Sequence, residues 1–496
     1  MSVAEPAPSS ELSGGVVRHE VEAVNAVGTR TLYKAREPIY PKRVKGTFRR
    51  LKWIIMALTL GVYYITPWIR WPRGADEPDQ AVLVDFAGQR FYFFFIEIWP
   101  DQLYFLTGLL VIAALSLFMA TALFGRVWCG YSCPQTVWTD LYVWVERFIE
   151  GDRNARMKLA KAPWTLDKIR KRVAKHFVWI AIGMATGGAW ILYFHDAPSI
   201  ARDFLRGEAP FTAYFFFTLL TLTTYIFAGS MREQVCTYMC PWPRIQAALT
   251  DEETLQVTYK IDRGEPRGAH KKGDTWEGRG DCVDCKACVV SCPMGIDIRE
   301  GAQLECINCA LCIDACDDIM SKVGRPRGLI DYDTDANIAR RAAGEQPRTK
   351  LVRPRTILYA GVLVFVSALM IIGLTTQATM VVNVIRDRTP PFILMSDGSI
   401  RNAYTVKIVN RENYTRELKI TVEGRGAMTI GAVGEDVEGS LVTLDAPGDT
   451  VRSVRIFATL PKDEAHGNSI PVTIRVIDPA TGEEALNPTV FMAGRE

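Results

Sequence analysis

Two runs of cysteines decide the fold of the centre of this chain. Residues 282–292 read CVDCKACVVSC, and residues 306–316 read CINCALCIDAC. Both runs have the spacing C-x2-C-x2-C-x3-C, which is typical of bacterial ferredoxins with two [4Fe–4S] clusters, where the fourth cysteine of each run binds the other cluster. Zinc sites usually contain two separated cysteine pairs, which is a different pattern. A zinc site and structural thiols are the alternatives to the clusters.

The ferredoxin pattern predicts two ligand sets, each with three cysteines from one run and the last cysteine of the other. The first set is Cys282, Cys285, Cys288 and Cys316, and the second is Cys306, Cys309, Cys312 and Cys292. Pro293 follows the first run as the pattern requires, whereas Asp317 replaces the proline after the second run and leaves the ligands intact. We therefore expect two [4Fe–4S] clusters.

Five apolar segments outside these runs have about the length that a helix needs to cross a bilayer, which is about 20 residues. They are residues 53–69, 102–125, 177–194, 209–231 and 356–385, the last through its first two-thirds. A buried core helix is the alternative for each, above all for the shorter first and third segments. Residues 91–100 (FYFFFIEIWP) are too short to cross and are expected at the membrane interface. The predicted fold class is a polytopic α-helical membrane protein with about five spans.

The distribution of lysine and arginine predicts the orientation of these spans. Residues 1–52 contain ten Lys and Arg against five Asp and Glu, and residues 126–175 contain eleven against five. Residues 70–101 contain three against six, and residues 195–208 contain two against three. The N-terminus and the cysteine runs are therefore expected inside the cell, and the C-terminal segment outside.

The position of the cysteines agrees with this orientation. All 12 cysteines lie on the predicted inner side, which is reducing, so they are expected to be metal ligands or redox groups rather than disulfides. The formal net charge of +3 gives no argument for nucleic-acid binding, and we predict no nucleic-acid partner. None of the five histidines lies inside a predicted span, which argues against a bis-histidine haem in the membrane.

A second cysteine motif occurs twice outside the two runs. Cys129-Gly-Tyr-Ser-Cys133-Pro follows the second apolar segment, and Cys236-Thr-Tyr-Met-Cys240-Pro follows the fourth. Proline favours the first turn of a helix, so we expect Cys133 and Cys240 at helix starts, where the dipole favours thiolate. If the two apolar segments pack together, the four sulfur atoms converge, and soft thiolates select Cu(I), zinc or iron–sulfur centres. A reversible disulfide and buried structural thiols are the alternatives.

The last 110 residues alternate between apolar and polar side chains in several short segments. The clearest are residues 403–410, 417–422, 451–460 and 470–478, which predict the strands of a β-sandwich. We divide the chain into a basic cytoplasmic tail (1–50), whose first 30 or so residues are expected to be disordered, a four-span membrane domain (51–250), a dicluster ferredoxin-like domain (251–350), a fifth span (351–378) and a C-terminal sandwich (379–496).

Three further stretches resemble the FixG/RdxA/CcoG family of cytochrome c oxidase accessory proteins. They are residues 39–43 (IYPKR), residues 91–100 and residues 126–140 (RVWCGYSCPQTVWTD). The resemblance covers nearly the whole chain. It implies an iron–sulfur protein of the bacterial cytoplasmic membrane, multi-pass, with an immunoglobulin-like periplasmic domain.

The resemblance also implies a function. The family is expected to help cbb-type cytochrome c oxidase to mature by reducing Cu(II) to Cu(I), which makes Cys129, Cys133, Cys236 and Cys240 candidate copper ligands. The implied partners are the lipid bilayer, oxidase assembly factors or copper chaperones and transporters, and an electron donor that the sequence does not identify. An electron-transfer subunit that links the clusters to a quinone or a partner protein, and a non-catalytic scaffold, are the alternatives.

Overall fold

The computed structural model describes residues 11–26, 37–73, 77–271, 273–424, 426, 428–438, 440–465 and 467–494. The chain divides into two compact units, Met1–Met370 and Ile371–Glu496. Of the predicted N-terminal tail, residues 1–10 and 27–36 lie outside the described part. The four-span and ferredoxin-like regions belong to the same compact unit.

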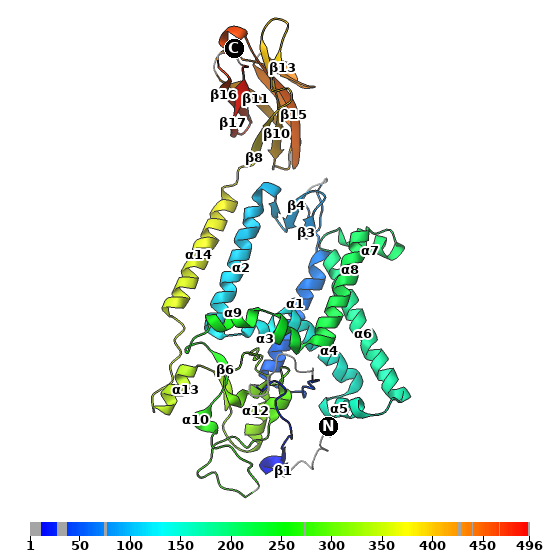
Figure 1. Cartoon of the computed structure of the whole chain (residues 1–496), viewed down its shortest axis with the longest axis vertical. Helices are drawn as coiled ribbons and strands as arrows, with labels where there is room; N and C mark the ends of the chain where they lie inside the picture. Colours follow the sequence, from blue (N-terminus) through cyan, green and yellow to red (C-terminus); the bar gives the residue numbers. More distant parts are fainter. Residues whose placement is uncertain are drawn as a thin grey trace. The chain divides into compact units, whose positions relative to one another are not determined.

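Each of the five predicted apolar segments forms a long helix (Figure 1). These are α1 (Thr47–Ile65), α2 (Leu103–Phe124), α6 (Leu166–Ile191), α8 (Phe211–Thr224) with its continuation η5 (Tyr225–Met231), and α14 (Pro354–Thr375). Three helices of the described chain are long and apolar enough to cross a membrane: Pro100–Phe124, Phe211–Met231 and Pro354–Thr375. Helices α1 and α6 do not meet the same criteria of length and apolar composition, so the count of five spans stays a prediction.

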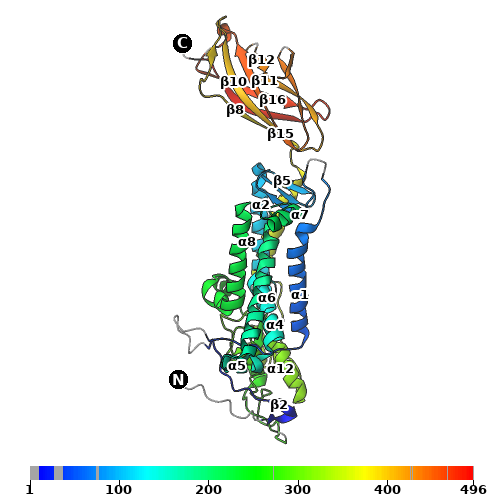
Figure 2. The same ribbon diagram turned by 90° about the vertical axis from the view of Figure 1, so that its right-hand side faces the viewer.

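Small residues bring α6 and α8 close together, and the two helices run side by side (Figure 2). A Cβ atom on Gly187 would lie 2.5 Å from the carbonyl oxygen of Phe217, and one on Gly183 would lie 2.9 Å from that of Thr221. A larger side chain at either glycine would force the helices apart, as at the small-residue interfaces of membrane helices.

The segment that connects α1 to α2 forms a small sheet at one end of the long helices. Strands β3 (Val82–Asp85), β4 (Arg90–Phe93) and β5 (Ile96–Ile98) are antiparallel, and the N–H of Val84 donates to the Tyr193 carbonyl at 2.8 Å. Residues 91–100 thus form strands, and their location at a membrane interface stays a prediction. Nearby lie η3 (Thr66–Trp68), η4 (Pro100–Gln102) and α7 (Ala197–Arg206).

The ferredoxin-like region lies at the opposite end of the helices. It contains strands β6 (Gln256–Tyr259) and β7 (Ile330–Asp333), which pair antiparallel, and the helices α10 (Ile261–Gly264), α11 (Ala287–Ser291), η7 (Ile298–Glu300), α12 (Leu311–Lys322) and α13 (Asp335–Ala342). The carboxylate of Asp314 in α12 accepts the N–H groups of Phe48 at 3.2 Å and Arg49 at 2.7 Å. It therefore caps the first turn of α1, where N–H groups have no partner within the helix.

The described N-terminal residues are ordered against this region. Residues 11–26 include β1 (Glu11–Leu12), η1 (Ser13–Gly15) and β2 (Val16–Val17), and the side chains of Leu12 and Val16 are buried in the same core as the cysteine runs. The N–H of His19 donates to the Cys285 carbonyl at 3.0 Å. The expectation of disorder is therefore wrong for residues 11–26, because apolar contacts with a distant part of the chain fix them.

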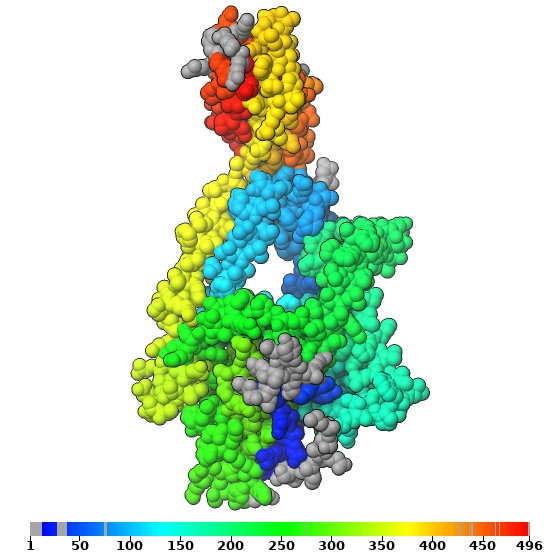
Figure 3. All heavy atoms as spheres, in the orientation of Figure 1, coloured from blue at the N-terminus to red at the C-terminus, as the bar shows by residue number. Residues whose placement is uncertain are grey.

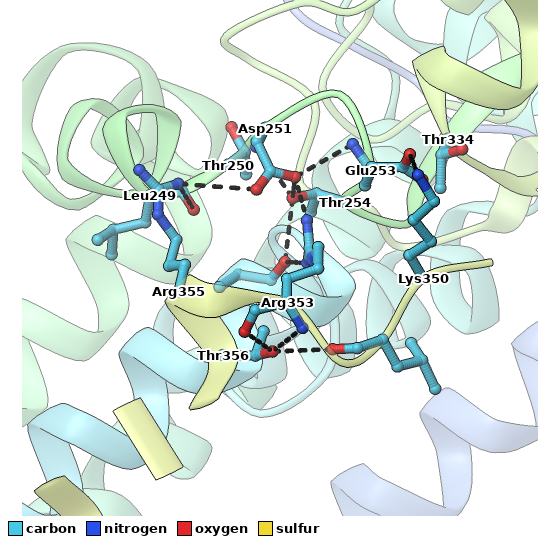
Figure 4. A network of polar contacts seen from close by, with 12 residues as sticks. Leu249, Thr250, Asp251, Glu253, Thr254, Thr334, Lys350, Arg353, Arg355 and Thr356 are labelled. Atoms are coloured by element: carbon cyan, nitrogen blue, oxygen red, sulfur yellow. Dashed lines mark hydrogen bonds and ion pairs between the residues drawn. The ribbon is translucent and has the colours of Figure 1, made fainter. Parts of the chain in front are cut away.

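Polar contacts fix the start of α14 against the end of α2 (Figure 4). The guanidinium of Arg353 donates to the Ala122 carbonyl at 2.6 Å and pairs with Asp251. The hydroxyl of Thr254 donates to the same carbonyl at 3.0 Å. The carbonyl of Ala122, in the last turn of α2, is thus satisfied by side chains of Thr254 and of Arg353, the residue before α14.

The second unit is a sandwich of two antiparallel sheets. One sheet has the order β12 (Thr429–Ala432), β15 (Thr450–Leu460), β10 (Ile400–Asn410), β8 (Met380–Arg386), with β9 (Ile393–Leu394) paired to β10. The other has the order β13 (Asp436–Glu438), β14 (Leu441–Ala446), β11 (Arg416–Glu423), β16 (Ser469–Ile477), β17 (Glu484–Met492). The predicted strands 403–410, 417–422, 451–460 and 470–478 are confirmed, because their alternate apolar side chains form the buried core.

A buried arginine in this sandwich makes a stability prediction possible. The guanidinium of Arg416 pairs with Glu483 at 2.8 Å and with Asp478 at 3.4 Å, and its side chain is 3% exposed. Burial raises the pKa of both carboxyls, but their hydrogen bonds and the Arg416 charge lower it overall: Asp478 accepts from Ala480 and Thr481, and Glu483 from Thr379 and Arg416. Replacing Arg416 by methionine leaves Asp478 buried without its cation, so we expect a loss of about 3 kcal/mol in the free energy of unfolding.

Urea unfolding of residues 377–496 measures this effect. Because the folded-state pKa values of Asp478 and Glu483 are lowered, their contribution is present above the unfolded value of about 4 and is lost as the pH falls below it. The matched control is Arg475→Met, because Arg475 pairs with Glu423 at 2.9 Å on the surface and should contribute less than about 1 kcal/mol. Equal losses for the two variants would contradict the prediction.

Candidate metal centre

The two cysteine runs have the same backbone conformation. The positive φ angles of Asp284 (51°) and Lys286 (56°) recur 24 residues later at Asn308 (52°) and Ala310 (59°). In both runs the second of these residues precedes a helix, α11 in the first and α12 in the second. Successive residues of this kind turn backbone N–H groups toward a common point, which is a typical arrangement around anions and iron–sulfur clusters.

The structure brings the fourth cysteine of each run to the other run. The thiol of Cys316 lies among those of Cys282, Cys285 and Cys288, close enough for their charges to interact. A cavity is lined by five cysteines, the four of the second set (Cys292, Cys306, Cys309 and Cys312) and Cys288 of the first. These are the two sets that the spacing predicts, and their role as cluster ligands stays a prediction.

The surroundings of these thiols fit a [4Fe–4S] cluster. Apart from the cysteines, the cavity around Cys292 is lined by apolar side chains, including Met294, Ile296 and Ile307. Burial raises the pKa of the Cys292 thiol to about 12 and that of the Cys306 thiol to about 11. Thiolates in such a place need a cationic partner, and iron ions supply that charge.

Backbone donors also point at the sulfur atoms. The N–H groups of Ala287 and Asn308 donate to the thiols of Cys285 and Cys306, and each bond lowers the pKa of its thiol. N–H groups at Met294 and Ile296 do the same for Cys292. Such bonds tune the reduction potential of a cluster.

The described thiols are not arranged as a single-ion site. Among the residues that the structure describes, no three His, Cys, Asp or Glu side chains are placed to hold one metal ion. Zinc requires four sulfur atoms about 2.3 Å from one point, whereas a cluster takes one cysteine at each of four iron corners. The ferredoxin spacing of the two runs thus predicts clusters rather than zinc.

The four remaining cysteines converge near the two predicted ligand sets, which we call the cages. Cys129 lies in α3 (Val127–Tyr131) and Cys133 is the N-cap of α4 (Pro134–Glu150); α5 (Arg153–Lys161) follows. Cys236 lies in η6 (Val235–Met239), which ends at Cys240, ahead of α9 (Trp242–Leu249). The charge of the Cys129 thiol interacts with those of Cys133, Cys236 and Cys240. We call these four residues the four-cysteine group.

The structure tests two expectations about the four-cysteine group, namely the place of Cys133 and Cys240 at helix starts and the effect of the helix dipole. Cys133 stands at a helix start as predicted, whereas Cys240 is separated from the first residue of α9 by Pro241. Burial raises the pKa of Cys133, whereas the backbone N–H groups of Thr136 and Gln135 at the start of α4 lower it, so the helix start favours the thiolate as predicted but is the smaller effect. The pKa values of Cys129 and Cys236 rise to about 12 for the same reason. Burial in apolar surroundings outweighs the dipole here.

The four-cysteine group touches the cage of the second run directly. A Cβ atom on Gly130 would lie 2.6 Å from the Ile307 carbonyl oxygen and 3.0 Å from the Cα of Cys309. The side chains of Cys129 and Cys236 belong to the same apolar cluster as Cys309. Only a glycine after Cys129 permits this approach. The contact could not be predicted from the sequence because the two segments are almost 180 residues apart.

An arginine precedes each of the two motifs and anchors it. Arg126 donates to the carbonyls of Leu304 and Cys306, and to that of Pro243 at 2.8 Å. Arg232 pairs with Glu146 of α4 at 2.6 Å. These anchors could be suspected from their position before each motif, but their partners could not.

A glutamine links the group to the apolar helix α2. The thiol of Cys129 donates to Oε1 of Gln246 at 3.1 Å, and Nε2 of Gln246 contacts the Thr121 hydroxyl at 3.3 Å. Gln246 is fully buried. It accepts the proton of a thiol that burial keeps neutral, and sequence analysis did not single it out.

Comparison with protein families gives three matches. The dicluster [4Fe–4S] domain matches residues 231–335, a second [4Fe–4S] binding domain matches residues 105–151, and the IG-like fold at the C-terminal of FixG matches residues 370–494. The Nitrogen fixation protein FixG of Rhizobium meliloti is 53% identical over 90% of this chain and 91% of its own length. The chain belongs to the FixG family.

Other members of the FixG family are almost as similar. Protein RdxB of Cereibacter sphaeroides is 48% identical over 93% of this chain and 98% of its own, and Protein RdxA of the same species is 49% identical over 91% and 96%. A crystal structure of a FixG-related protein from Vibrio parahaemolyticus matches 23% of this chain and 97% of its own with 17% identity and a TM-score of 0.20. This FixG-family chain is an iron–sulfur redox protein with a C-terminal Ig-like domain, and its apolar helices make it a membrane protein.

Pairs of substitutions test which cysteines share a cage. In the double variant Cys292→Ser with Cys309→Ser, both changes fall in one predicted set, so anaerobic protein should retain about four iron atoms out of about eight. In Cys292→Ser with Cys285→Ser the changes fall in different sets, so nearly all iron should be lost. Iron and acid-labile sulfide analysis measures both, with Ser321→Ala as the control. The reverse result would show that each run binds its own cluster.

Proposed function

We propose that this protein is a membrane-bound iron–sulfur reductase that assists the maturation of cbb-type cytochrome c oxidase by reducing Cu(II) to Cu(I). The contact between Gly130 and the Ile307–Cys309 backbone carries the proposal, because it joins a thiol group suited to copper to a cage suited to electrons. Bound [4Fe–4S] clusters supply single electrons, and the copper couple takes up one electron per ion.

The chemistry of the four-cysteine group supports copper as the substrate. Thiolates are soft ligands that prefer Cu(I) to Cu(II), so they stabilise the product of the reduction. Cys240 is exposed, whereas Cys129 is 8% exposed and in contact with the cage residues. The group thus extends from the surface to the buried electron source, which suits an ion that enters, is reduced and leaves.

The group does not form a closed single-ion site in the described residues. Copper ligation therefore requires the thiols to move toward the ion and to lose their protons. A loosely arranged donor set suits a substrate that must be released to a partner by ligand exchange, and a closed four-thiolate site would retain it.

The arrangement of charges supports a location in the bacterial inner membrane. Arg49, Arg126 and Arg353 lie at the ends of α1, α2 and α14 that meet the ferredoxin-like region, and lysine and arginine mark the cytoplasmic ends of membrane helices. We place the N-terminus and the ferredoxin-like region in the cytoplasm and the Ig-like domain in the periplasm, with five spans. The proposed partners are oxidase assembly factors or copper chaperones and transporters.

An electron-transfer subunit without a copper step is the second candidate. It is favoured by the two [4Fe–4S] domain matches, which by themselves describe an electron carrier. This candidate predicts that a quinone or a partner protein reoxidises the reduced clusters and that Cu(II) does not.

A stopped-flow measurement tests the copper step. Anaerobic protein is reduced with dithionite, freed of excess reductant and mixed with Cu(II), and Cu(I) is trapped with bathocuproine. We expect up to two Cu(I) ions per chain. Replacing Cys129, Cys133, Cys236 and Cys240 by serine should slow this reaction at least tenfold because no thiolate then stabilises Cu(I).

The control for this measurement is reoxidation by ferricyanide, a soluble oxidant that needs no thiolate. Its rate should be unchanged in the quadruple serine variant, which shows that the clusters are intact. The copper assignment is wrong if the variant reduces Cu(II) as fast as the unaltered protein.

A further inference from the structure

A large apolar cavity lies between α1 and α2, next to the ferredoxin-like region. Its volume is about 1050 Å³, and its walls come from α1, α2, α3 and α9 together with Leu255 and Tyr332. Figure 3 shows the molecule open beside α2, above α9. Sites for drug-sized ligands and cofactors have volumes of about 300–1000 Å³ and mostly apolar walls.

The walls of this cavity differ along its length. The α1 and α2 sides carry Leu51, Ile55, Ala113, Leu117 and Ala120, which are apolar and suit a hydrocarbon chain. The other end carries Trp128, Trp242 and two tyrosines, Tyr131 and Tyr332. An aromatic end with hydroxyl groups suits a planar ring with polar substituents.

The two tyrosines have different partners. The hydroxyl of Tyr332 donates to the Asn308 carbonyl at 2.7 Å, which fixes its proton. The hydroxyl of Tyr131 lies 3.5 Å from that of Tyr332, at the limit of a hydrogen bond. Because the proton of Tyr332 goes to Asn308, Tyr131 is the donor of this long bond, and a ligand carbonyl oxygen at 2.7–3.0 Å would be a better acceptor for its proton.

The aromatic end of the cavity lies next to the cage of the second run, with Asn308 and Gly130 between them. Asn308, which accepts the Tyr332 hydrogen bond, stands between Cys306 and Cys309 in the sequence. Tyr131 follows Gly130, whose backbone touches Cys309. A redox-active ring at the tyrosines would thus lie against the protein layer that encloses Cys309.

We propose that this cavity binds a lipid-soluble quinone, with its ring at Tyr131 and Tyr332 and its isoprenoid tail between α1 and α2. The proposal rests on the proposed function only for the destination of the electrons, because it supplies the electron donor of the same site. A phospholipid acyl chain would fill the apolar part, but it has no use for two tyrosines or for the neighbouring cage.

The electron count of this reaction balances. Oxidation of one quinol breaks two O–H bonds and yields the quinone, two electrons and two protons. Clusters held by the two ligand sets would take up one electron each, and the protons go to water. Two Cu(II) ions then accept the two electrons, so one quinol gives two Cu(I).

Binding is tested first, by a readout that needs no electron transfer. Decylubiquinone is titrated into the full chain in nanodiscs, and the fluorescence of Trp128 and Trp242 is followed. We expect saturable quenching that the double variant Trp128→Phe with Trp242→Phe loses. Filling the cavity with Ala113→Phe and Ala120→Phe should weaken the apparent affinity at least tenfold.

A matched variant on the same helix is the control. Leu110 of α2 is 63% exposed and is not part of the cavity wall, so Leu110→Phe should leave the affinity unchanged. Quenching that does not saturate, or that all variants share, would overturn the proposal and leave acyl chains as the occupant.

Electron transfer is tested second, in the direction that favours the quinone. Dithionite-reduced protein is mixed with decylubiquinone, and the recovery of cluster absorbance is timed. The filled variant should react at least tenfold more slowly than the unaltered protein, whereas its reoxidation by ferricyanide should be unchanged. Equal quinone rates would overturn the inference.

The two proposals can fail separately. Rapid reoxidation by quinone with none by Cu(II) would keep the quinone site and remove the copper reductase. Rapid reoxidation by Cu(II) with no saturable quinone binding would do the opposite. Replacing Tyr131 by phenylalanine should weaken quinone affinity about threefold to tenfold without changing the Cu(II) rate, because it removes one hydrogen bond at nearly constant volume.

Discussion

The exchange of the fourth cysteines between the two runs is the constraint on which the first unit depends. Cys316 stands with the first run and Cys292 with the second, so neither cage can form unless both runs are folded. The helix that carries Cys316, α12, also carries Asp314, which caps α1. Formation of the cages is therefore coupled to the position of a membrane-domain helix.

A second contact joins the cages to the membrane helices. Gly130 lies against Cys309, and Arg126 holds the carbonyl groups of the loop that leads into the second run. The short helix α3 thus contacts three places at once: the four-cysteine group through Cys129, the cage through Gly130 and the apolar cavity through Tyr131. The five residues of α3 therefore contact the proposed quinone site, a predicted cluster cage and the proposed copper site.

The sequence predicts those features that depend on patterns among residues close together in the chain. The cysteine spacing predicts two ligand sets because neighbouring cysteines of a ferredoxin run bind one cluster. Alternation in residues 403–410 or 451–460 identifies strands because one sheet face is buried. Apolar length identifies the helices but does not decide whether α1 and α6 cross the membrane.

The features that the sequence did not predict depend on contacts between distant residues. The order of residues 11–26 comes from Leu12 and Val16 in a core supplied by residues 257–330. The raised pKa of Cys133 comes from burial, which a helix-start rule does not include. Neither the Gln246–Cys129 bond nor the cavity at Tyr131 has a local signature, because each is assembled from several helices.

Iron and acid-labile sulfide analysis of the anaerobically purified full chain, combined with EPR of the dithionite-reduced protein, tests the central claim most directly. The account predicts about eight iron and eight sulfide per chain and the low-temperature signals of two reduced [4Fe–4S] clusters. Zinc without inorganic sulfide at these cysteines would contradict it, and the electron route built on the two cages would then have no basis.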